Sequence, residues 1–150
     1  MKKIYFLLFI NSIILSNEIE RNKVLNVMVD HNYDLSDQQY NDLGTYFCFP
    51  FTFNGESDTK IAENERELKK IFKKIRKGLP RDHSRKDWKK MNVKILNDKI
   101  AIVNAMYSSI NDKDENYFTG TAMYLFRKID NSWKIFSMTP FKPYNYFVFE

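Results

Sequence analysis

The sequence contains two histidines, His31 and His83, and imidazoles are the side chains best suited to proton transfer near neutral pH. His31 falls near the C-terminal end of a predicted first helix, where the helix dipole favours a cation, so we expect it at the surface. His83 stands in the string Asp82-His83-Ser84. Because the members of a catalytic triad are neighbours in space and rarely in sequence, this string predicts a polar loop.

Carboxylates are the other candidates for acid–base chemistry, and the predicted strands do not supply them. No Asp, Glu or His occurs in the five strand segments Thr45–Phe53, Trp88–Leu96, Ile100–Ile110, Phe118–Arg127 and Trp133–Phe141. Proton-transfer catalysis needs a titratable group within hydrogen-bond reach of the substrate. We therefore predict no catalytic residue on the sheet, and helices and loops remain as the other sources of one.

A metal or cofactor site is not indicated either. Two histidines far apart in the sequence do not form a ligand pattern, and we predict no metal and no cofactor. Cys48 is the only cysteine, so neither an intramolecular disulfide nor a cysteine metal cluster can form. It lies in an aromatic run, which predicts a small buried thiol.

Helix signals dominate the first half of the chain. The pattern N-x-x-E from Asn17 to Glu20 is a capping box that opens a helix. A second capping box, at 36–39, predicts a short helix that ends at Gly44. The clearest helix is expected near 62–77, where apolar residues recur with helical spacing and Gly78 follows.

The second half reads as strands. A strand with a Pro50 bulge or edge is expected over Tyr46–Phe53. Alternating residues predict the strand Trp88–Leu96, and a longer strand follows over Ile100–Ile110. Two aromatic-rich runs around the turn Asp130-Asn131 predict a long β-hairpin.

The sequence of that hairpin resembles the last hairpin of the NTF2-like superfamily, which includes SnoaL-like and ketosteroid-isomerase-like proteins. The similar residues are Thr119-Gly120-Thr121 in the first strand and Trp133-Lys134-Ile135 in the second. The order helix, helix, strand, helix and four strands is similar too, over roughly residues 18–141. The resemblance implies an α+β cone fold, with a curved antiparallel sheet wrapped around N-terminal helices over residues 17–150. It also implies a ligand hollow inside the cone and a homodimer through the convex face of the sheet.

Aromatic and sulfur side chains on the strands are the candidate ligand contacts. Tyrosines there can bury the ring and offer a hydroxyl, although ordinary core packing explains the same residues. The candidate ligand-binding residues are Tyr46, Phe51, Phe53, Tyr107, Tyr124, Phe126 and Met138.

The segment 1–16 has two lysines followed by an apolar run too short for an ordinary membrane span. It predicts a signal peptide, with an uncleaved anchor or an extra buried helix as alternatives. A cleaved signal implies an exported protein without a membrane span in its mature form, and otherwise a cytoplasmic one. The basic stretch 66–90 lacks interleaved stacking aromatics, so we interpret it as a solvated helix face and predict no nucleic-acid partner.

Three functions remain open. The first is a non-catalytic domain that binds a small apolar or amphipathic ligand. The second is a SnoaL-type isomerase, dehydratase or hydrolase with acid–base groups from helices and loops. The third is a structural dimerisation module whose cone is filled by aromatic side chains.

Overall fold

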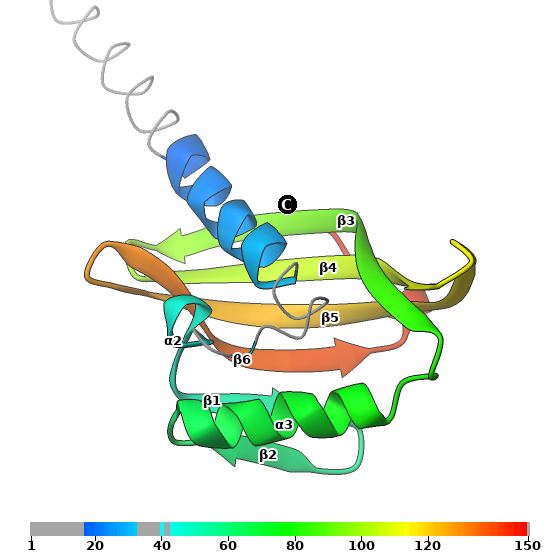
Figure 1. The fold of residues 1–150 in the computed structure, drawn as a ribbon. Coiled ribbons are helices and arrows are strands. Elements are labelled where there is room, and N and C mark those ends of the chain that lie inside the picture. Colours follow the sequence, from blue (N-terminus) through cyan, green and yellow to red (C-terminus); the bar gives the residue numbers. More distant parts are fainter. Residues whose placement is uncertain (1–16, 33–39, 41–42, 150) are drawn as a thin grey trace, which may run out of the picture.

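The computed structural model describes residues 17–32, 40 and 43–149. A helix over 17–32 comes first and is followed by the remaining elements (Figure 1), which are α2 (Leu43–Tyr46), β1 (Phe47–Asn54), β2 (Thr59–Ala62), α3 (Glu65–Lys77), β3 (His83–Asn97), β4 (Ile100–Asn111), β5 (Asn116–Ile129), β6 (Ser132–Phe141) and the 3-10 turn η1 (Pro143–Asn145). The predicted signal segment 1–16 and the capping box at 36–39 lie outside the described residues. Within the described part, no helix is both long and apolar enough to cross a membrane.

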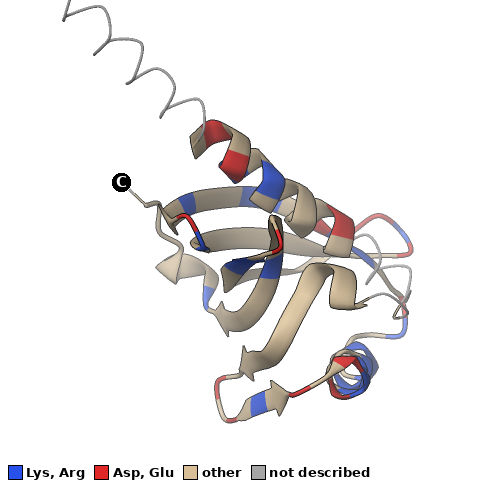
Figure 2. Ribbon diagram, turned by 90° about the vertical axis from the view of Figure 1, so that its left-hand side faces the viewer, with Lys and Arg blue, Asp and Glu red and all other residues tan. Residues whose placement is uncertain are grey.

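One curved sheet of six strands carries the fold, in the order β2-β1-β6-β5-β4-β3. Neighbouring strands are antiparallel except β1 and β6, which run parallel. The helix over 17–32 and α3 lie against the sheet (Figures 1 and 2). This arrangement confirms the predicted α+β cone, with one parallel pair added to the antiparallel strands.

The β5–β6 hairpin turns at Asp130 and Asn131, as predicted. Both residues have positive φ, 47° and 62°, which is the conformation of a two-residue hairpin turn that matches the twist of the strands. Asp and Asn adopt this left-handed conformation more readily than other residues with a side chain. The residue types of the turn therefore explain why the last hairpin can be recognised in the sequence.

The helix over 17–32 is fastened to this hairpin by Glu20. Its carboxylate accepts hydrogen bonds from Lys128 Nζ at 2.7 Å, Trp133 Nε1 at 2.7 Å and Lys23 Nζ at 2.8 Å. The Lys128 and Lys23 hydrogen bonds lower the pKa of Glu20 to about 2. Val24 and Met28, one and two turns further on, are fully buried in the core.

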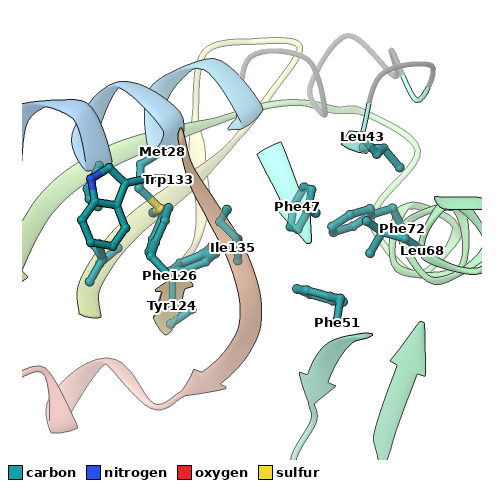
Figure 3. Close-up of a cluster of buried hydrophobic side chains, with 14 of the residues drawn as sticks. Met28, Leu43, Phe47, Phe51, Leu68, Phe72, Tyr124, Phe126, Trp133 and Ile135 are labelled. Atoms are coloured by element: carbon teal, nitrogen blue, oxygen red, sulfur yellow. The ribbon is translucent and has the colours of Figure 1, made fainter. Parts of the chain in front are cut away.

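The core has two adjoining parts (Figure 3). Met28, Trp133, Phe126, Tyr124 and Ile135 gather below the N-terminal helix, and Leu43, Phe47, Phe51, Leu68 and Phe72 gather between α2, β1 and α3. Phe47 and Phe72 join β1 to α3, with ring centres 5.3 Å apart. Cys48 is buried, as predicted.

Three features differ from the sequence expectation, and one agrees with it. Gly44 lies inside α2 and does not end a helix, and the short edge strand β2 was not predicted. The β1–β6 register shifts between Phe47 and Thr52, around Pro50, as a bulge there predicts. Most consequential for the site, β3 begins at His83, so the predicted polar loop is wrong at that residue.

The C-terminal tail crosses the outer face of the sheet. Asn104 Nδ2 donates a hydrogen bond to the Phe147 carbonyl, and Phe149 N–H donates to Asn92 Oδ1 at 2.9 Å. Asn92 and Asn104 are cross-strand partners, and their strand neighbours Val93 and Val103 point to the opposite, core-facing side.

Candidate functional site

A hollow opens between the end of the N-terminal helix, the C-terminal half of α3 and the core-facing side of the sheet. Its volume is about 80 Å³. The described residues that line it are His31, Asn32, Tyr40, Phe72, Ile75, Arg76, Leu79, His83, Lys86, Tyr124 and Met138.

His31 lies at the inner end of this hollow and is only 2% exposed, so the predicted surface position is wrong. Its Nδ1 lies 3.1 Å from the Val27 carbonyl, so this nitrogen carries the proton and Nε2 is the acceptor. Burial, together with the positive charge of Lys86, lowers the pKa of His31 to about 3. The imidazole is therefore neutral, and it packs edge-on against Phe47 and Tyr124.

Lys86 brings an amine into the hollow from β3. Its Nζ lies 4.5 Å from the centre of the Tyr107 ring and 5.7 Å from that of Trp88, both within the range of a cation–π interaction. Desolvation lowers the pKa of Lys86 to about 8. Among the described residues no carboxylate forms an ion pair with it; the nearby Asp87 pairs with Arg85 at 3.0 Å.

Arg76 faces Lys86 from α3. One guanidinium nitrogen, Nη2, donates to the His83 carbonyl at 3.1 Å, which fixes the side chain against the start of β3. His83 Nδ1 in turn lies 2.6 Å from the Tyr117 hydroxyl. Partial burial, and then the charges of Arg76 and Lys86, lower the pKa of His83.

The Tyr124 hydroxyl is the least satisfied polar group of the lining. Tyr124 is 1% exposed, and its hydroxyl has no hydrogen-bond partner in the described structure. Burial raises the pKa of Tyr124 above its usual range, so the group stays protonated and can donate. A buried hydroxyl without a partner is costly, and a polar ligand atom in the hollow would satisfy it.

Two of the predicted ligand contacts, Tyr124 and Met138, line the hollow. Tyr107 lies beside it, under the Lys86 amine. The other predicted contacts lie elsewhere: Phe51 and Phe126 are fully buried in the core, Tyr46 belongs to α2, and Phe53 is a half-buried residue of β1.

The sequence analysis missed His31, Arg76, His83 and Lys86 as lining residues. A signal existed for two of them: His31 continues the helical spacing of Val24 and Met28, and Lys86 shares the strand period of Trp88. The prediction that the sheet carries no imidazole or carboxylate is wrong because β3 is longer than expected and includes His83 and Asp87.

A curved sheet closed by helices around a partly polar hollow defines the NTF2-like class of α+β proteins. Residues 28–143, more than half of the chain, match the family described as NTF2-like protein (DUF6841). The chain belongs to this family. No curated protein sequence matches it significantly.

Solved structures agree on the fold. A protein of unknown function with a cystatin-like fold from Nostoc punctiforme PCC 73102 is 18% identical, with a TM-score of 0.68 over 81% of this chain and 90% of that one. A candidate scytalone dehydratase from Novosphingobium aromaticivorans DSM 12444 is 18% identical, with a TM-score of 0.62 over 83% and 84%. A candidate ketosteroid isomerase from Shewanella frigidimarina NCIMB 400 is 15% identical, with a TM-score of 0.61 over 79% and 94%.

Proposed function

We propose that the hollow binds a small amphipathic molecule, an apolar body that carries a carboxylate or a similar anionic group. The observation that carries this proposal is the pair of cations, Arg76 and Lys86, in a lining whose described residues include no Asp or Glu. Both side chains are half-buried, and a charge that loses part of its hydration is stabilised by a nearby opposite charge. An anionic ligand would supply the missing partner.

The other lining residues match the rest of such a ligand. Phe72, Ile75 and Met138 offer apolar surface, and the unpartnered Tyr124 hydroxyl offers a donor. Pockets of this composition hold a ligand by apolar burial and orient it with a few polar groups. The open volume also disfavours a cone filled entirely by side chains.

Isothermal titration with benzoate and benzamide tests the proposal, since the two molecules share a shape and differ in charge. A charge-assisted hydrogen bond contributes about 1.5–3 kcal/mol, so benzoate should bind at least about tenfold more tightly. Arg76→Met should remove most of that preference.

The matched control is Lys73→Met, which removes a cation from an exposed position on the same helix. It should leave the affinity for benzoate within about twofold, because exposed charges are screened by water and salt. Equal binding of benzoate and benzamide by the unmodified protein would contradict the proposal.

A proton-transfer enzyme is the second candidate, favoured by the presence of two imidazoles in the lining. His31, with a pKa of about 3, is a weak base at neutral pH. His83 is the better base, because it is only half-buried. Deuterium exchange at the carbon next to the carbonyl of a bound ketone, followed by NMR, would show such an activity. His83→Gln should abolish the exchange if His83 is the base.

A further inference from the structure

We propose that Lys86 is a nucleophilic amine, and that it forms an imine with the carbonyl carbon of a small aldehyde or keto acid bound in the hollow. The inference deepens the proposed function, on which it rests for the position of the ligand, by naming a substrate class. The geometry behind it is an amine that lines a ligand-sized hollow without an acidic partner among the described residues.

The surroundings of Lys86 differ from those of the ion-paired lysines. Lys128 lies 2.7 Å from Glu20, and Lys60 lies 2.8 Å from Asp58. The Lys86 amine instead lies over the faces of Tyr107 and Trp88. Aromatic faces attract the ammonium form weakly, and they accept no proton from it, so the amine is not held permanently as half of an ion pair.

The titratable groups around Lys86 do not offer it an ion-pair partner. Arg76 faces it from α3, His31 from the N-terminal helix, His83 from its own strand, and Tyr107 and Tyr124 from β4 and β5. None of these groups carries a negative charge at neutral pH. Burial lowers the pKa of Lys86 to about 8, so roughly a tenth of the amine is unprotonated at pH 7.

The chemical step needs no external oxidant or reductant. The neutral amine of Lys86 attacks the carbonyl carbon, forming the C–N bond and placing the electron pair on the carbonyl oxygen. That oxygen takes up the two protons lost by the nitrogen and leaves as water, which gives the imine. Tyr124 is placed to donate a hydrogen bond to the oxygen, and Arg76 to bind the carboxylate of a keto acid.

The test uses glyoxylate, an aldehyde with a carboxylate, and cyanoborohydride, which reduces the imine to a stable carboxymethyl-lysine. Peptide mapping of the full chain then compares Lys86 with the exposed Lys89 and Lys90 as internal controls. We expect Lys86 to be modified at least about tenfold faster at pH 7.5, because its free-amine fraction is larger. Equal or slower modification of Lys86 would overturn the inference, and this comparison needs no variant.

Two variants sharpen the result. Lys86→Arg keeps the positive charge and removes the nucleophile, so fast labelling should disappear from the β3 peptide. Lys73→Met removes an amine outside the hollow and should leave Lys86 labelling unchanged.

Competition separates the inference from the proposed function. Excess benzoate should slow the labelling of Lys86 and leave that of Lys89 unchanged. If benzoate binds and Lys86 is labelled no faster than the exposed lysines, the imine inference is wrong and the binding function stands. If Lys86 is labelled fast but benzoate neither binds nor competes, the binding function is wrong and the reactive amine stands.

Discussion

The His31 imidazole and the Tyr124 phenol meet edge to face below the N-terminal helix, with their ring centres 5.9 Å apart. This contact brings the last turn of the helix onto the centre of the sheet. It also buries a titratable group, since His31 is only 2% exposed to solvent. Protonation of His31 in the folded protein is therefore unfavourable, and the free energy of unfolding depends on pH.

Acid should destabilise the protein through His31. Its pKa is about 3 when folded and about 6.5 when unfolded, so between these values the unfolded chain binds a proton that the folded chain does not. The free energy of unfolding should fall by up to roughly 1.4 kcal/mol for each pH unit below about 6.5. Urea titrations at pH 7 and pH 5 measure this slope.

His31→Asn is the matched variant, because an Asn amide can still donate to the Val27 carbonyl. The variant should be less stable at pH 7, since ring contacts with Phe47 and Tyr124 are lost. Its stability should nevertheless change less between pH 7 and pH 5. The same pH slope in both proteins would show that His31 is not the group responsible.

We expect Glu20 to contribute more to the free energy of unfolding than a residue on a helix surface usually does. Glu20→Gln weakens the charge-assisted hydrogen bonds from Lys128 and Trp133 and should cost about 1–3 kcal/mol in the free energy of unfolding. Glu18→Gln, on an exposed position of the same helix, is the control and should change it by less than about 0.5 kcal/mol. Chemical denaturation decides, and equal effects of the two substitutions would contradict the role given to Glu20.

Gly120 should resist substitution because Tyr107 lies across it. A Cβ at this position would come within 2.5 Å of the Tyr107 ring and hydroxyl, which is far inside contact distance. Gly120→Ala should therefore destabilise the protein by about 1–3 kcal/mol and displace the ring under the Lys86 amine.

Gly44→Ala is the control for that substitution. Its nearest contact would be a Glu65 carboxylate oxygen at 3.6 Å, an ordinary distance, and Gly44 lies in a helix, where Ala is preferred. The Tm of Gly120→Ala should fall, whereas the Tm of Gly44→Ala should rise or stay unchanged. A neutral Gly120→Ala would show that Tyr107 moves freely.

The sequence was a good guide where a local pattern decides the structure. Asp130 and Asn131 mark their turn because few residues accept positive φ. The order of the elements then indicated the cone. The edge strand β2 was missed because its four residues, Thr59–Ala62, have too little alternation to form a pattern.

The hollow was harder to predict because it is assembled from distant residues. His31, Arg76 and Lys86 each have a plausible surface explanation when considered alone, and only the packing of the helices on the sheet turns them inward. Composition misled as well: aromatic residues were expected to line the cone, but Phe51 and Phe126 are used to fill the core. Polar residues on the apolar face of an element were the more informative signal.

The outer face of the sheet carries apolar side chains that a second subunit could cover. Met123 and Leu125 point away from the core, opposite to Tyr124, and stay partly exposed although the tail contacts Asn104, the cross-strand partner of Met123. We propose that this apolar surface pairs in a homodimer. Light scattering at micromolar concentration should give the dimer mass, and Met123→Glu should give the monomer mass. A monomer before substitution would contradict the proposal.

The most direct test of the anionic-ligand proposal is the affinity of the unmodified protein for benzoate between pH 6 and pH 10, beside that of Lys86→Met. The protonated amine attracts the anion, and its pKa is about 8 in the free protein, so affinity should be nearly constant below about pH 8 and fall above it. Lys86→Met should bind more weakly and show no such fall. If the two proteins bind benzoate equally at every pH, the charge of Lys86 does not hold a ligand and the account of the hollow is wrong.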